Sequence, residues 1–202
     1  MSGIAIIDSG GANIASLKAA LGRLGAESVV TTDHDIIRRA TRILLPGVGS
    51  AHSAMAKLRG AGLERLIPTL KQPLLGICLG MQLLFDRSEE GPANCLGVIR
   101  GSIDKLEFAP GKPVPHMGWN QFTQVRPDPL LEGVSSLDHV YFVHSFAAPT
   151  SSATVAITDY GVAFTAVARH ENFCGTQFHP ERSGVVGARI LANFLKEPMQ
   201  PS

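Results

Sequence analysis

The sequence predicts an α/β protein with a mostly parallel central sheet and helices on both of its faces. Over residues 4–85, short continuous apolar runs alternate with segments whose apolar residues recur at helical spacing, as in consecutive β-α-β units. Over residues 98–178, the runs are short, rich in β-branched and aromatic residues, and separated by Gly, Pro, Asn and Asp. This second pattern predicts antiparallel or mixed strands that continue or flank the same sheet.

The first half opens with a strand at residues 4–7, because an unbroken apolar run is typical of a strand covered on both faces. A helix follows, with the apolar residues of positions 14–24 on one face and Gly25 as its C-terminal stop. The later segments are, in order, a strand at 28–31, a helix at 33–40, a strand at 43–45, a helix over 63–70, a strand at 74–77 and the start of a helix at 81–85.

The second half is predicted to contain six short strands and one helix. The strands are residues 98–102, 121–125, 140–143, 154–158, 165–168 and 174–178. The last helix spans residues 185–195, and only the tail at 197–202 is expected to fray. No repeat or low-complexity linker divides the chain, so we expect one domain over residues 1–202, with its core at about 3–196.

The composition excludes several classes of function. A formal net charge of +1 with 17% charged residues offers no basic face for nucleic acid. No apolar run approaches the length of a membrane span, and the N-terminus is predicted to be a strand, not a signal peptide. The 3 cysteines form no CxxC pair and no disulfide framework, which favours the reducing cytoplasm. We expect no metal, because the histidines and cysteines lack the usual ligand spacing.

The segment Gly76-Ile77-Cys78-Leu79-Gly80 is typical of a nucleophile at a strand-to-helix turn. The flanking glycines leave room where a sharp turn brings backbones close together, and the N-terminus of the next helix favours a thiolate. The Leu79 N–H is placed to donate to an oxyanion. A buried cysteine in a glycine-rich turn is the alternative.

His179 and Glu181 follow the apolar run at 174–178, with Pro180 between them. Two residues apart in an extended chain, they can project toward one face, so the acid can orient the imidazole while the other ring nitrogen reaches a thiol. The alternative is a loop histidine beside a solvated glutamate. Together with the Cys78 segment, the pair predicts a nucleophile, base and orienting acid for acyl transfer through a thioester.

The glycine-rich loop after the third strand is a candidate oxyanion site. In a doubly wound sheet such loops line the ligand crevice, and Gly47 and Gly49 permit a backbone N–H near Val48 to turn toward a negative charge. An ordinary turn with Ser50 as a helix cap remains the alternative. Gln82 can either bind a polar substrate or be a partly buried helix residue satisfied by the backbone.

These motifs together resemble the class I, triad-type glutamine amidotransferases. Two more segments, Pro115-His116-Met117-Gly118-Trp119-Asn120 and Tyr141-Phe142-Val143-His144-Ser145, narrow the resemblance to glutaminase subunits of imidazole glycerol phosphate synthase. The resemblance implies a flavodoxin-like, three-layer α/β/α fold with a mostly parallel central sheet and added antiparallel strands in the C-terminal half. It also implies an enzyme without a cofactor.

The resemblance further implies that Cys78 attacks L-glutamine, that His179 moves the protons, and that Glu181 orients His179. Substrate or oxyanion contacts are implied for Gly47, Val48, Gly49, Leu79, Gln82, Ser145 and Phe146. Ammonia would pass to a (β/α)₈ cyclase subunit in a heterodimer, which makes imidazole glycerol phosphate and an aminoimidazole carboxamide ribotide. The turn at Asn13, Tyr141 and the Trp119–Asn120 region would lie toward that partner.

Three residues depart from the family pattern, namely Ser9, Ala12 and Phe146. They put local interface or substrate contacts in question and leave the triad intact. The alternatives are an amidotransferase subunit of another synthase, such as anthranilate synthase, or a γ-glutamyl peptidase with the same thioester chemistry and no ammonia acceptor. A module that has lost its activity is the non-enzymatic alternative.

Overall fold

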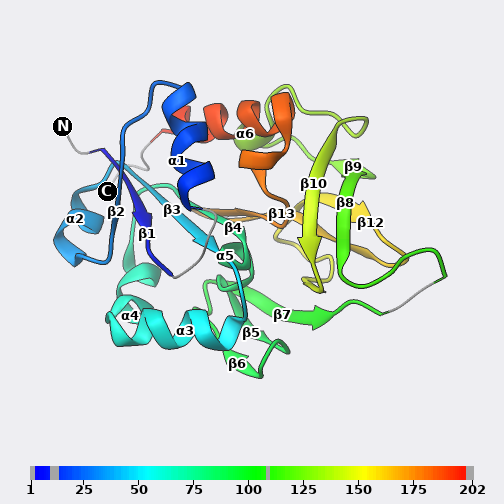
Figure 1. The fold of residues 1–202 in the computed structure, drawn as a ribbon, viewed down its shortest axis with the longest axis horizontal. Coiled ribbons are helices and arrows are strands. Elements are labelled where there is room, and N and C mark those ends of the chain that lie inside the picture. The colour runs from blue at the N-terminus through cyan, green and yellow to red at the C-terminus, as the bar shows by residue number, and fades with distance from the viewer. Residues whose placement is uncertain (1–2, 10–13, 108–109, 199–202) are drawn as a thin grey trace.

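An eight-stranded sheet runs through the centre of the protein (Figure 1). The structure is a computed structural model that describes residues 3–9, 14–107 and 110–198. Five parallel strands form one part of the sheet in the order β2 (Ser28–Thr31), β1 (Ile4–Ile7), β3 (Arg42–Gly47), β4 (Leu74–Cys78) and β14 (Phe173–Thr176). Three antiparallel strands extend it: β13 (Ala163–His170), β12 (Thr154–Asp159) and β9 (Gln124–Val125).

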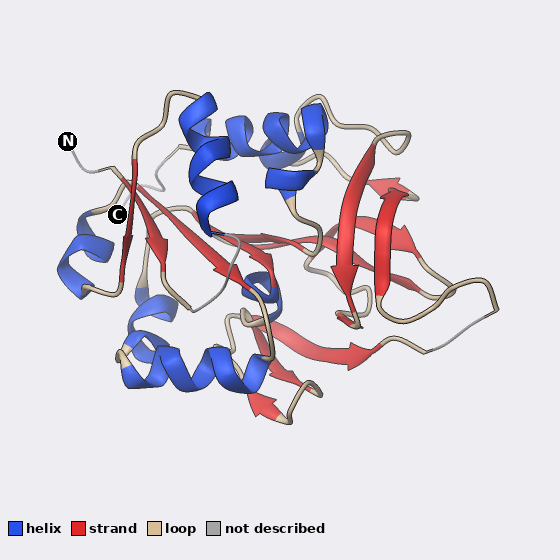
Figure 2. Ribbon diagram, viewed as in Figure 1, coloured by secondary structure: helices blue, strands red, loops and turns tan. Residues whose placement is uncertain are grey.

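Helices cover both faces of this sheet (Figure 2). One face carries α1 (Ile14–Arg23) and α6 (Gly184–Lys196), and the other carries α2 (His34–Arg39), α3 (Ala51–Gly60), α4 (Leu63–Leu66) and the 3₁₀ turn Ile67–Thr69. Along β1, Ala5 and Ile7 face one helical layer while Ile4 and Ile6 face the other. The predicted three-layer α/β/α fold with added antiparallel strands is therefore confirmed.

Local sequence signals explain why several predicted elements have the expected bounds. Asp33 caps α2 by accepting hydrogen bonds from the N–H groups of Asp35 and Ile36, as a short polar side chain does at a helix start. Gly25, just beyond α1, adopts φ +73°, a conformation that glycine reaches without steric cost. No helix among the described residues is long and apolar enough to cross a membrane.

Two sequence predictions were wrong. The helix expected at 81–85 is the short α5 (Leu79–Gln82), because the carbonyls of Leu83 and Leu84 accept hydrogen bonds from the N–H groups of residues 96, 98 and 99 and so cannot continue a helix. The strand expected at 121–125 is divided, because Gln121 ends β8 (His116–Gln121) in one sheet and Gln124 starts β9 in another. The helix α3 was not predicted from the sequence.

Two small sheets flank the end of the parallel strands. The first is a two-stranded antiparallel ribbon of β8 and β10 (His139–His144), visible at the right of Figure 1. The second contains β5 (Phe85–Ser88), β6 (Ala93–Asn94), β7 (Ile99–Lys105) and β11 (Phe146–Ala147). Short 3₁₀ turns at Pro129–Leu131 and Pro180–Arg182 complete the secondary structure of the described residues. The site described below lies where these sheets meet β4 and β14.

Candidate active site

Cys78 occupies a sharp turn between β4 and α5. Its backbone has φ 54° and ψ −113°, a left-handed conformation that is strained for a residue with a side chain. The neighbouring glycines are required by space: a Cβ on Gly80 would lie 1.7 Å from the Leu45 carbonyl oxygen, and one on Gly76 would lie 2.7 Å from the Gly80 oxygen. The turn therefore has the geometry expected of a nucleophile elbow.

The structure brings the mid-chain thiol and the C-terminal imidazole together. The side chain of His179 is hydrogen-bonded to Cys78, and its Nδ1 lies 2.8 Å from Glu181 Oε1. The His179 and Glu181 side chains are only 4% and 2% exposed, so the contact is shielded from water. The extended chain predicted here was wrong, since Pro180–Arg182 forms a 3₁₀ turn that folds the carboxylate back onto the ring.

The charge on His179 follows from its partners. Burial lowers the pKa of His179, but the hydrogen bonds and charges of Cys78 and Glu181 outweigh burial and raise this pKa to about 10. The ring is therefore an imidazolium at neutral pH, with Nδ1–H donating to Glu181. An adjacent imidazolium stabilises a thiolate, the nucleophilic form of cysteine.

A cavity of about 350 Å³ opens beside Cys78 and His179. Six of the seven predicted substrate-binding residues line it: Val48, Gly49, Leu79, Gln82, Ser145 and Phe146. The seventh, Gly47, is not among the lining residues and packs against α5, where a Cβ would lie 2.9 Å from the Gly80 nitrogen. The volume is within the range of small-ligand sites.

The Gln82 amide is held by two acceptors. Its Nε2 donates to the Phe146 carbonyl at 2.8 Å and to Gln177 Oε1 at 3.0 Å. Both N–H groups are thus used, which leaves the Gln82 oxygen as the group that can accept a hydrogen bond from a ligand. Gln82 is 3% exposed and is held partly by the backbone, as one alternative predicted; it also borders the cavity, and substrate binding stays a prediction.

The loop after β3 contains the helix cap expected at Ser50, while its oxyanion role stays a prediction. Ser50 caps α3 by accepting from the Ser53 N–H, and Gly49, with φ +88°, borders the cavity beside Val48. The departure at Ser9 has a local role, because its hydroxyl donates to the Pro46 carbonyl and ties the segment after β1 to the end of β3. The Asn13 turn and the departure at Ala12 lie outside the described residues.

Two polar residues of the site were missed by the sequence analysis. Glu90 lines the cavity, and its carboxylate accepts a hydrogen bond from the Ala51 N–H. Burial raises the pKa of Glu90, and the bond from Ala51 opposes that rise. Gln177 is fully buried and lies with its Nε2 3.9 Å from Cys78 Sγ. The only sequence signal for Gln177 was a polar residue inside an apolar run.

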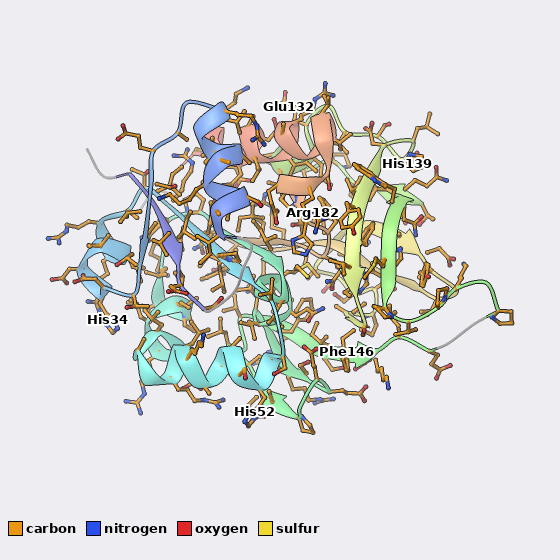
Figure 3. All side chains as sticks on the ribbon, in the orientation of Figure 1. His34, His52, Glu132, His139, Phe146 and Arg182 are labelled. Atoms are coloured by element: carbon orange, nitrogen blue, oxygen red, sulfur yellow. The ribbon has the colours of Figure 1, made fainter. Side chains whose placement is uncertain are left out.

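The outer face of the β8–β10 ribbon adjoins this cavity. Trp119 lies opposite Tyr141 and Met117 lies opposite Val143, and Val143 borders the cavity. Trp119 and Met117 are 56% and 62% exposed, an unusual exposure for large apolar side chains. The Arg182 guanidinium lies 4.6 Å from the centre of the Tyr141 ring, beside β10 in Figure 3.

Among the described residues, no three His, Cys, Asp or Glu side chains are grouped in a way that could hold a metal ion. Cys78, Cys95 and Cys174 are free thiols. The polar groups around the cavity can therefore support covalent catalysis by cysteine, with an imidazolium as proton donor and backbone N–H groups near Leu79 and Val48.

Comparisons with known proteins agree with this geometry. The family described as "Glutamine amidotransferase class-I" matches residues 5–198. "Imidazole glycerol phosphate synthase subunit HisH" of Xanthomonas campestris pv. campestris (strain 8004) is 51% identical over 196 residues, covering 97% of this chain and 98% of the relative. The protein of the same name in Xylella fastidiosa (strain Temecula1) is 50% identical over the same coverage.

Solved structures are similar in fold. A crystal structure of a glutamine amidotransferase has a TM-score of 0.74 at 19% identity, covering 96% of this chain and 97% of that one. A putative GMP synthase protein from Thermoplasma acidophilum also has a TM-score of 0.74, at 20% identity, covering 95% of this chain and 91% of its own. At these identities the likeness concerns the architecture alone.

Proposed function

The chain belongs to the class-I glutamine amidotransferases, and from this premise we propose that it is the glutamine-hydrolysing subunit of an imidazole glycerol phosphate synthase. The observation that carries the proposal is the contact of His179 with both Cys78 and Glu181 beside the cavity. The near-full-length identity of about half to HisH subunits favours this synthase over an anthranilate synthase subunit or a γ-glutamyl peptidase. The free thiols fit the cytoplasm as its location.

In the proposed reaction, the Cys78 thiolate attacks the side-chain carbonyl carbon of glutamine. The oxyanion forms beside the Leu79 N–H, which begins a helix and so has no intrahelical acceptor, and beside the loop at Val48 and Gly49. His179 gives its proton to the departing nitrogen, which leaves as ammonia while the thioester forms. Water then attacks the thioester with His179 as base, and glutamate and the thiolate are released.

The polar lining of the cavity fits the free amino acid. We propose that the Glu90 carboxylate binds the α-ammonium group of glutamine. Glu90 lines the cavity, and a carboxylate forms a charged hydrogen bond with an ammonium group. The amide oxygen of Gln82 remains available as an acceptor, and we propose that it accepts a hydrogen bond from an N–H group of the same glutamine. Ser145 and Phe146 also line this cavity, and the Phe146 carbonyl holds the Gln82 amide.

The outer face of the β8–β10 ribbon is the proposed contact with a (β/α)₈ cyclase subunit in a heterodimer. An exposed Trp119 with Met117 beside the cavity mouth is the kind of apolar surface that a partner covers. We expect Trp119→Ala to weaken binding to the cyclase about 30-fold or more. Val29→Ala, on β2 at the other edge of the central sheet, is the control and should bind normally. Equal affinities for both variants would contradict this assignment.

The test of the proposed function separates ammonia production from ammonia use. In the complex with the cyclase, Cys78→Ala should lose synthesis from glutamine and keep synthesis from added ammonium salts. The reason is that the thiol only generates ammonia, whereas the partner incorporates it. Loss of both activities in an assembled complex, or survival of both, would overturn the proposal.

A further inference from the structure

Two buried histidines of the β8–β10 ribbon take no part in the mechanism above. His116 and His144 face each other across the two strands, on the inner side of the ribbon, and are 2% and 6% exposed. His116 Nδ1 lies 3.2 Å from His144 Nε2. Two imidazoles at this distance cannot both carry a proton on the facing nitrogens, so one donates and the other accepts.

The surrounding partners fix the direction of every hydrogen bond in this pair. A carbonyl oxygen can only accept, so His144 Nδ1, 2.9 Å from the Phe146 oxygen, carries the hydrogen. Burial and the neighbouring His116 lower the pKa of His144 to about 3, so the ring is neutral and its Nε2 accepts from His116 Nδ1. His116 Nε2 in turn faces the Asn120 amide, whose Nδ2 donates to it at 3.4 Å and to the Asp159 carbonyl at 3.0 Å.

Packing holds the chain of hydrogen bonds in place. The His116 ring is stacked between Tyr160, with ring centres 3.9 Å apart, and Phe142, with ring centres 4.8 Å apart. Tyr160 is itself fixed by its hydroxyl, which donates to the Pro113 carbonyl at 2.9 Å. The charged groups that act on the pair are Lys112, which is paired with Asp159, and His179. The two rings therefore have one arrangement in which every nitrogen is satisfied.

The chain ends on an atom of the substrate cavity wall. The Phe146 carbonyl accepts from His144 Nδ1 and also from Gln82 Nε2, so the same oxygen joins the histidines to the Gln82 amide. If this carbonyl turned, Gln82 Nε2 would lose one of its two acceptors, and the amide would no longer be held in a single orientation.

We propose that His116 and His144 are positioning residues for glutamine binding, which hold the Phe146 carbonyl and thereby keep the Gln82 amide in its substrate-accepting orientation. The inference rests on the proposed glutaminase function. It assigns no proton transfer to either ring, and it explains why two polar side chains are buried in an aromatic cluster at the back of the cavity.

Substitutions at His144 test the proposal through a split in the kinetic constants of the complex with the cyclase. Asparagine places an N–H donor where His144 Nδ1 lies, whereas leucine places none there. We expect His144→Leu to raise the KM for glutamine about tenfold or more and to leave ammonia-dependent synthesis unchanged, while His144→Asn keeps the KM close to the wild-type value. An unchanged KM in His144→Leu, or equal defects in both variants, would overturn the proposal.

The wild-type protein provides a second measurement that needs no substitution. Long-range ¹H–¹⁵N spectra should show both His116 and His144 as neutral rings protonated on Nδ1 at pH 7. A ring protonated on Nε2 at His144 would contradict the proposed chain, even if the leucine variant failed to fold. If the wild-type complex itself lacks glutaminase activity, the proposed function fails, which is distinct from an active wild type whose KM is insensitive to His144.

Discussion

The backbone N–H of His179 donates a hydrogen bond to the carbonyl of Tyr141, with 3.0 Å between nitrogen and oxygen. Ser183 strengthens this connection, because its hydroxyl donates to the His179 carbonyl at 2.7 Å and accepts from the Tyr141 N–H at 2.9 Å. The imidazole beside Cys78 is therefore anchored to the strand whose outer face carries Tyr141 next to Trp119. A partner that covers this ribbon would therefore contact β10, the strand to which the backbone of His179 is hydrogen-bonded.

The pKa of His179 is the first testable property of the site. Nuclear magnetic resonance titration of the ring should give a pKa near 10 in the wild type, against an ordinary value of 6.5, because Cys78 and Glu181 outweigh burial. Cys78→Ala and Glu181→Gln should each lower it, since burial alone favours the neutral ring. A wild-type ring that titrates near 6.5 would contradict the ion pair.

The raised pKa of His179 makes the contribution of this residue to stability depend on pH. The folded-state pKa of His179 lies above the unfolded value, so the contribution of the protonated ring is complete below about pH 6.5 and is lost as the pH rises toward 10. The stability difference between the wild type and His179→Asn, measured by urea unfolding, should therefore shrink over that interval.

Glu90 should control the binding of glutamine more than its turnover. Glu90→Gln keeps an oxygen that can accept from the Ala51 N–H but removes the charge that faces the cavity. We expect the KM for glutamine to rise about tenfold or more, because a charged hydrogen bond to the ammonium group is lost, with a smaller change in kcat. Glu89→Gln is the matched control, since the Glu89 carboxylate accepts from the Lys105 N–H away from this cavity. A KM that responds equally to both substitutions would refute the assignment.

The glycines of the Cys78 turn are much more tightly packed than Gly22 of α1. Gly80→Ala would place a Cβ 1.7 Å from the Leu45 oxygen, a backbone atom that cannot move aside. We expect a loss of more than about 3 kcal/mol of unfolding free energy, or no folded protein. Gly22→Ala in α1 meets no atom within 4 Å and should stabilise the protein by about 0.5–1 kcal/mol. Thermal unfolding of the two variants measures both changes in stability. A Gly80→Ala protein as stable as the wild type would show that the turn is not tightly packed.

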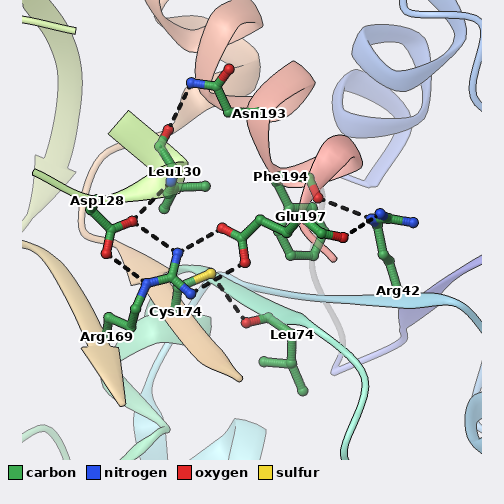
Figure 4. A network of polar contacts seen from close by, with 9 residues as sticks. All are labelled: Arg42, Leu74, Asp128, Leu130, Arg169, Cys174, Asn193, Phe194 and Glu197. Atoms are coloured by element: carbon green, nitrogen blue, oxygen red, sulfur yellow. Dashed lines mark hydrogen bonds and ion pairs between the residues drawn. The ribbon is translucent and has the colours of Figure 1, made fainter. Parts of the chain in front are cut away.

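A buried ion-pair cluster fixes the C-terminal helix to the sheet (Figure 4). Arg169 of β13 bonds both oxygens of Asp128, at 2.7 and 2.9 Å, and both oxygens of Glu197, at 3.2 and 2.6 Å. Burial lowers the pKa of Arg169, but these hydrogen bonds outweigh it and raise the pKa overall. Arg42 adds bonds to the carbonyls of Phe194 and Glu197 at the end of α6.

Removing the Arg169 guanidinium should therefore lower the free energy of unfolding. Arg169→Met leaves two carboxylates, each 7% exposed, without their partner, and we expect a loss of about 3–5 kcal/mol in urea unfolding at neutral pH. Arg100→Met is the control, because the Arg100 side chain is 93% exposed beside Asp86 and its removal should leave the urea midpoint unchanged. Equal midpoints for the two variants would show that the cluster does not hold the helix.

Much of the fold could be predicted because its signals are local. The apolar runs of β1 and β2 match the observed strands, and Asp33 marks the start of α2 as a cap. The helix α3 had a readable signal too, since Ala51, Ala54, Met55 and Leu58 recur at helical spacing and are all buried. The end of α5 had none, because it is set by hydrogen bonds from residues that follow more than ten positions later.

The site shows the same division between local and distant signals. Cys78 and its glycines could be identified because a strained turn needs a particular short sequence. Glu90 and Gln177 could not, because Glu90 lines the cavity from one part of the chain and Gln177 contacts Gln82 and Cys78 from another, and only the folded chain places them together. The residue types alone do not distinguish a site carboxylate from a surface carboxylate. They also do not distinguish a site amide from a buried amide that only satisfies the backbone.

Covalent labelling can identify Cys78 as the nucleophile. The complex with the cyclase would be treated with 6-diazo-5-oxo-L-norleucine, an electrophilic glutamine analogue, and digested for peptide mass spectrometry. With Cys78 as the nucleophile activated by His179, one adduct should form on Cys78 in step with the loss of glutaminase activity, with none on Cys95 or Cys174, and His179→Asn should slow it. Inactivation without an adduct on Cys78 would show that another residue is the nucleophile.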